Sequence, residues 1–211
     1  MSDLLPATDG LFLGNDSRRW DGSKLINVVT AEGRPKSATT YLGLPGVDFV
    51  STGTTSVSTN RLYYAPFYVA TPVTIDRICC EVTGNAAAGN LARLGIYRAD
   101  ADWQPTNLVI DAGTVSAETI GFKSIVVNAA LSPGRYLTAF INNASPVFRV
   151  VRGGNRYAGL NSTVGSNPLV VYLFKNTTFA PFPQTGTLWD TISYGTVPFQ
   201  HFVFLRISQF N

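Results

Sequence analysis

The sequence predicts an all-β protein, and three observations support this class. From Arg61 onward, short apolar or alternating segments recur at a spacing of roughly 8–12 residues, which is typical of β-sandwiches and barrels. Gly, Pro, Asn and Asp stand between the segments, where tight turns are expected. We find no segment longer than about ten residues with the apolar stripe of an amphipathic helix.

The composition predicts one domain that belongs to a larger assembly. The chain has 211 residues, of which 45% are hydrophobic and only 14% are charged. This length suits one domain, or one domain with an arm. The charged fraction is far below the roughly 25% of ordinary soluble domains. Because charges of both signs normally keep soluble domains apart, we expect this surface to meet neighbouring subunits.

Residues 1–60 are predicted to form an extended N-terminal arm. Short apolar pieces alternate here with Gly, Asp, Ser and Pro, and residues 51–60 are rich in Ser and Thr. The segment is too poor in apolar residues to bury itself, so we expect it to dock on a partner. Its candidate assembly residues are Phe12, Arg18, Arg19 and Trp20.

Residues 61–211 are predicted to form the β-rich body. In chain order, the expected strands cover residues 62–69, 73–82, 92–97, 108–111, 123–128, 136–141, 147–151, 169–174 and 201–208. The second of these alternates in its first half and then shifts at Arg77 and Ile78, which indicates a β-bulge. The last carries apolar residues on both faces, so it lies in the middle of the fold or against a neighbouring subunit.

The cysteines and the termini favour synthesis in the cytoplasm. Cys79 and Cys80 are adjacent, and neighbours on a strand point to opposite faces, so we expect free thiols in a reducing compartment. The N-terminus lacks the basic and apolar regions of a signal peptide. No segment approaches the roughly 20 apolar residues of a membrane helix. We therefore expect no membrane insertion.

The sequence offers little that indicates catalysis, a cofactor or nucleic-acid binding. His201 is the only histidine and lies in an aromatic segment, and no Gly-x-Ser-x-Gly motif is present. Asp100 and Asp102 could help to bind Ca²⁺, but we favour a turn held by Asx hydrogen bonds. The net charge of +3 has no basic cluster to match a nucleic acid. We predict no enzyme activity, no metal and no cofactor.

Aromatic residues in polar loops are candidates for binding neutral sugars. Flat rings pack on the apolar face of a pyranose, while Arg and Asp side chains hydrogen-bond to its hydroxyls. The candidates are Trp103, Arg156, Tyr157, Trp189 and Asp190. Tyr157 comes first, because its Gly-rich loop is a poor place for a core ring. For either tryptophan we favour the alternative that its ring closes an end of the sandwich.

Four motifs within residues 61–151 carry a family resemblance. They are YYAPFYVATPVTIDRI at 63–78, ARLGIY at 92–97, NLVIDAG at 107–113 and LSPGRYL at 131–137. Together they resemble a β-sandwich found in virion proteins of tailed bacteriophages and prophages. The same order is similar to the jelly rolls of carbohydrate-binding modules in secreted bacterial proteins.

The resemblance implies a non-enzymatic structural protein of a virion: a small fibre, spike or decoration subunit on the head or tail. It implies a homo-oligomer, with a trimer favoured, an arm that docks on other virion proteins, and host surface glycans as a candidate ligand. A long repetitive shaft is missing, so a compact appendage fits better than a long fibre. The alternatives are a carbohydrate-binding module outside a virion and, third, a glycan depolymerase.

Overall fold

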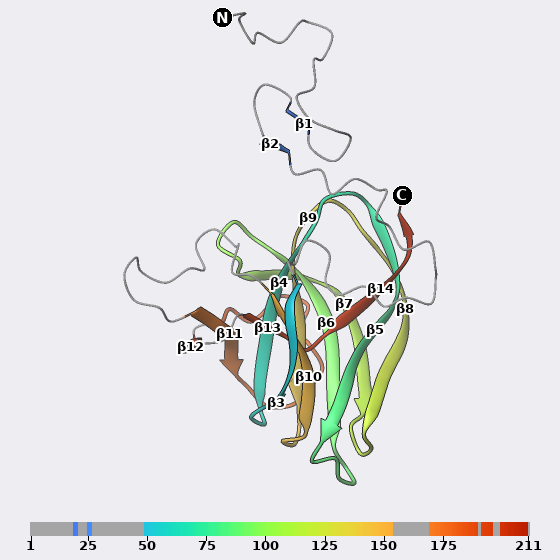
Figure 1. Cartoon of the computed structure of the whole chain (residues 1–211), viewed down its shortest axis with the longest axis vertical. Helices are drawn as coiled ribbons and strands as arrows, with labels where there is room; N and C mark the ends of the chain where they lie inside the picture. Colours follow the sequence, from blue (N-terminus) through green and yellow to red (C-terminus); the bar gives the residue numbers. More distant parts are fainter. Residues whose placement is uncertain are drawn as a thin grey trace, which may run out of the picture. The chain divides into compact units, whose positions relative to one another are not determined.

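We describe a computed structural model, which covers the backbone of residues 19–20, 25–26, 49–153, 169–189, 191–195 and 199–210 (Figure 1). The chain divides into two compact units, residues 1–38 and 39–211. In the first unit, β1 (Arg19–Trp20) pairs antiparallel with β2 (Leu25–Ile26). Of the predicted assembly residues, Arg19 and Trp20 form β1, whereas Phe12 and Arg18 lie outside the described residues.

The second unit consists of two antiparallel sheets, which confirms the all-β prediction and fits a β-sandwich. No helix occurs in the described parts of the chain. Sheet 1 contains β3 (Phe49–Ser56), β5 (Val73–Gly84), β8 (Gly121–Leu131), β10 (Val147–Gly153), β13 (Phe199–His201) and β14 (Phe204–Phe210). Sheet 2 has the order β12 (Thr191–Gly195), β11 (Leu169–Asn176), β4 (Arg61–Val69), β9 (Gly134–Asn142), β6 (Leu91–Ala99) and β7 (Pro105–Ser116).

Strand β3 belongs to sheet 1, although its residues fall in the segment predicted as an arm. It runs antiparallel to β10, with Ser56 opposite Val147 and Thr52 opposite Val151. The compact unit that holds the sandwich begins at Thr39. The sandwich therefore includes residues that the sequence assigned to the arm.

The last two strands both belong to sheet 1, where β13 pairs with β10 and β14 pairs with β5. His201 of β13 is opposite Val151 of β10, and Phe204 of β14 is opposite Cys79 of β5. Apolar side chains of this segment are buried: Phe202, Val203, Leu205 and Ile207. The burial agrees with the apolar faces seen in the sequence, but the segment forms two strands instead of the single strand predicted over residues 201–208. Contact with a neighbouring subunit stays a prediction. The register of β5 against β8 shifts between Ile75 and Arg77, which confirms the bulge close to its predicted position.

The main core lies between the two sheets and is rich in aromatic rings. Phe140 of β9 contacts Phe148 of β10 and Phe202, with ring centroids 4.9 and 5.0 Å apart. Cys80 points into the same core, where burial raises the pKa of its thiol to about 12. Cys79 is buried as well, and both cysteines are free, as predicted.

A second apolar cluster covers the outer face of sheet 2. The segment 177–189, which we call the strap, places Phe179, Phe182 and Trp189 on this face. Beneath them lie side chains of β4, β6, β9 and β11, together with Trp103: Leu62, Tyr64, Tyr97, Leu137, Ala139, Ile141 and Leu173. Because both faces are covered, burial along β4 and β9 is almost continuous instead of alternating. No helix in the described residues is long and apolar enough to cross a membrane.

Candidate functional site

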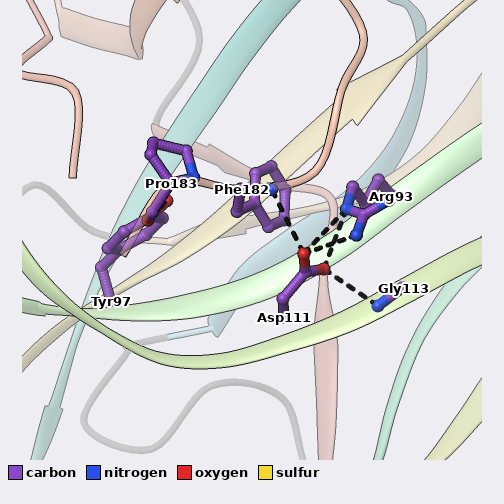
Figure 2. A network of polar contacts seen from close by, with 6 residues as sticks. All are labelled: Arg93, Tyr97, Asp111, Gly113, Phe182 and Pro183. Atoms are coloured by element: carbon purple, nitrogen blue, oxygen red, sulfur yellow. Dashed lines mark hydrogen bonds and ion pairs between the residues drawn. The ribbon is translucent and has the colours of Figure 1, made fainter. Parts of the chain in front are cut away.

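An ion pair on sheet 2 holds the strap at its middle (Figure 2). The guanidinium of Arg93 on β6 donates from Nε to both carboxylate oxygens of Asp111 on β7, at 2.9 and 3.0 Å. The same carboxylate accepts the backbone N–H of Gly113 at 3.0 Å and that of Phe182 at 3.2 Å. Asp111 therefore joins β6, β7 and the strap through one side chain.

Two tyrosines and one glycine of sheet 2 also hold the strap in place. The hydroxyl of Tyr97 donates to the Pro183 carbonyl, and that of Tyr64 donates to the Thr187 carbonyl, each at 2.8 Å. Gly95 leaves room for the ring of Phe182, because a Cβ at position 95 would lie 2.7 Å from two of its carbons. The strap is therefore seated through both hydrogen bonds and close packing.

At one end of the strap, its Trp189 contacts Trp103, and both tryptophans were candidates in the sequence. We call this place the tryptophan corner, formed by Trp103, Trp189, Arg135 and the turn 100–104. Trp189 Nε1 donates to the Trp103 carbonyl at 2.8 Å. The Arg135 guanidinium lies 5.3 Å from the Trp103 ring centroid and donates to the Ala101 carbonyl at 2.6 Å. The corner thus joins the turn 100–104, β9 and the strap.

The turn at the tryptophan corner has the Asx geometry that the sequence favoured. Oδ1 of Asp100 accepts the backbone N–H groups of Asp102 and Gln104, at 2.9 and 2.8 Å. This confirms the turn interpretation of Asp100. Among the described residues, no group of three or more His, Cys, Asp or Glu side chains could hold a metal ion.

The structure brings together two of the predicted sugar-binding residues and leaves three untested. Trp103 is only 6% exposed and packs under the strap, so its ring is occupied by the protein's own side chains. Trp189 is partly buried beside it. Arg156, Tyr157 and Asp190 lie outside the described residues, so their role remains a prediction.

An exposed aromatic residue near this corner is not among those predicted from the sequence. Tyr68 of β4 is half-exposed and lies opposite Arg135 of β9 in the antiparallel register. The signal was available: Leu62 and Tyr64 also point to the outer face of sheet 2, and alternation along the strand places Tyr68 on the same face. The pair offers a ring and a guanidinium, groups that commonly contact sugars.

Sheet 1 presents a different surface along β8. Val126 is 69% exposed, Phe122 is 46% exposed, and Ile120, just before the strand, is 68% exposed. The nearby ion pair between Glu81 and Arg149 has an N–O distance of 3.1 Å and is about one-third exposed. This side of the molecule therefore combines exposed apolar side chains with a solvated ion pair.

Comparison with known proteins adds no family to this geometry. No protein-family model matches the sequence, and no curated protein is significantly similar to it.

Proposed function

We propose that the protein is a non-enzymatic structural subunit of a tailed-bacteriophage virion, in the form of a small fibre, spike or decoration protein. The observation that carries the proposal is the contrast between its two outer faces. The strap covers sheet 2, whereas β8 of sheet 1 exposes Val126 and Phe122. An exposed apolar patch on a β-sandwich is typical of a surface that meets another protein.

The polar groups of the sandwich support a structural role. Asp76, Glu81 and Asp111 each accept hydrogen bonds from an arginine, and Asp100 accepts two from its own turn. Carboxylates engaged in this way hold strands and turns in place. Burial raises the pKa of both cysteine thiols, which disfavours the thiolate that a nucleophile requires.

The finer parts of the proposal extend the same role. The sandwich has jelly-roll topology, and the N-terminal segment docks on other virion proteins through Phe12, Arg18, Arg19 and Trp20. The chain works as a homo-oligomer, in which a two-fold contact, argued below, takes the place of the trimer that the family resemblance favours. Host surface glycans are the proposed ligand of the outward surface.

The direct test is to detect the chain in purified particles. Phage or prophage particles from the strain that carries the gene would be banded on a density gradient and analysed by quantitative mass spectrometry. We expect a fixed copy number per particle in the wild type. A particle fraction without the chain would contradict the proposal.

A carbohydrate-binding module outside a virion is the second candidate, and Tyr68 beside Arg135 is the observation that favours it. Glycan-array binding would be compared between the wild type and Tyr68→Ala, with Tyr157→Ala testing the loop candidate. The module predicts sugar binding by a chain that is absent from particles. Unchanged binding in both variants would exclude both rings.

A further inference from the structure

Strand β8 is an edge of sheet 1. Over its 11 residues it pairs, within the described part of the chain, with β5 alone. Its second edge therefore presents backbone N–H and C=O groups that suit another strand. Natural edge strands usually carry charges that prevent such pairing, but β8 has one charged residue, Lys123, whose Nζ donates to Thr119 at 2.6 Å.

The core is also less well covered on this side. The strands β7 and β8 follow each other in sequence, and each lies at an edge of its own sheet. Seven hydrophobic residues that pack against the main core remain partly exposed, and six of these belong to β7 and β8: Val109, Ile110, Ala112, Val115, Ile125 and Val127. A partner on this side would bury more apolar surface, which favours association.

We propose that a second copy of the chain pairs with β8 through an antiparallel, two-fold contact centred on Ser124. This contact rests on the proposed structural role and names the surface that carries it. A two-fold axis at Ser124 places Phe122 of each copy opposite Val126 of the other. Aromatic and β-branched side chains form favourable cross-strand pairs. Both residues are exposed in the single chain.

The charges and sizes of β8 suit its own sequence in this register. Lys123 comes opposite Ile125, so no like charges meet across the axis. Ile120 comes opposite Asn128, and the small Ser124 meets itself at the centre. A self-complementary strand is what an isologous two-fold contact requires. The second copy is therefore a better match than a charged partner.

The experiment measures the mass of the full-length chain by light scattering and analytical ultracentrifugation. We expect an even number of chains, because a two-fold contact joins copies in pairs. Val126→Lys buries an ammonium group without a partner, so we expect the dissociation constant to rise about tenfold or more. Leu188→Lys is the matched control, because Leu188 lies in the strap and is 57% exposed. The oligomer of this variant should have the same mass as that of the wild type.

A charge-swap mixture tests the register itself. Phe122→Glu should weaken the contact as Val126→Lys does. When the two variants are mixed, the introduced lysine lies opposite the introduced glutamate, so we expect paired chains to form again. Far-UV circular dichroism and thermal unfolding verify that each variant is folded.

A wild-type monomer would overturn this contact, and it would result if another segment of the same chain covers β8. A wild-type trimer would overturn it as well. So would an oligomer whose mass is unchanged by Val126→Lys, or a mixture of the two variants that stays monomeric. None of these affects detection of the chain in particles. Failure of the contact and failure of the proposed function are thus separate results.

Discussion

The outer faces of the two sheets differ in whether another segment of the chain covers them. Sheet 2 is covered by the strap, and the side chains beneath it form a second apolar cluster. Sheet 1 has no such layer among the described residues, and its outer face carries ion pairs and the exposed residues of β8. The comparison shows that the outer face of sheet 2 is packed against the strap, and it supports the proposal that the outer face and edge of sheet 1 are the surface for association.

The largest effect is expected from Phe182→Ala in the strap. The ring is buried in the second cluster, 6.1 Å from the ring of Tyr97 and 5.7 Å from the guanidinium of Arg93. Removing a buried phenylalanine ring typically costs about 3–5 kcal/mol. Urea unfolding should show this loss, whereas Leu188→Ala, in the same segment but exposed, should stay within about 0.5 kcal/mol. Equal losses would show that the strap does not stabilise sheet 2.

Gly95→Ala should lower stability by a smaller amount. The new methyl group would lie 2.7 Å from the Phe182 ring and 2.8 Å from the carbonyl oxygen of Ile110, so the strap or β7 must shift. Such overpacking costs about 1–3 kcal/mol. The control is Gly84→Ala in sheet 1, where the methyl group meets Val147 at an ordinary 3.5 Å, and there a change within about 1 kcal/mol is expected. Thermal unfolding of the two variants measures the difference.

The two sheets can also be compared by breaking one ion pair in each and measuring the loss of stability. Arg93 and Asp111 have side chains only 16% and 18% exposed, and Asp111 also holds the Phe182 N–H. We expect Asp111→Asn to cost about 1–3 kcal/mol and to speed hydrogen exchange in the strap. Glu81→Gln breaks the more exposed pair of sheet 1 and should cost at most about 1 kcal/mol. The reverse order would contradict the contrast between the sheets.

The smallest effect concerns pH and the pair between Asp76 and Arg206. The hydrogen bond from Arg206 lowers the pKa of Asp76 below its usual value. The carboxylate therefore contributes stability above the unfolded pKa of about 4, and this contribution is lost as the pH falls through the folded pKa. Asp76→Asn should flatten the decline of unfolding free energy below about pH 4. An unchanged slope would exclude this pair as a source of acid sensitivity.

The sequence predicted the class of the fold because local patterns determine it. The turns, the alternation, the bulge in β5 and the burial of the final segment could all be predicted from neighbouring residues. The strand β3 was not, because Phe49–Ser56 is rich in Ser, Thr and Gly and pairs with a strand about 90 residues away. Its place depends on backbone hydrogen bonds with β10 and little on its own apolar pattern.

The site was harder to predict because its parts are distant in the chain. Trp103 and Trp189 are 86 residues apart, and nothing local indicates that the indole of one reaches the carbonyl of the other. The strap has no periodic pattern, so nothing in the sequence indicates that Phe179 and Phe182 cover a sheet. The role of Asp111 could not be predicted, because its arginine partner lies on another strand.

The position of β13 and β14 has a consequence for the order of folding during synthesis. Before residues 199–210 exist, β5 and β10 share only a short contact near Gly84 and Val147. Until this segment pairs, residues 73–79 of β5 and 151–153 of β10 each lack the neighbouring strand that they have in the folded chain. Sheet 1 is therefore completed only by the last segment to leave the ribosome among those described, and a chain truncated before residue 199 would expose the edges of β5 and β10 that β14 and β13 cover.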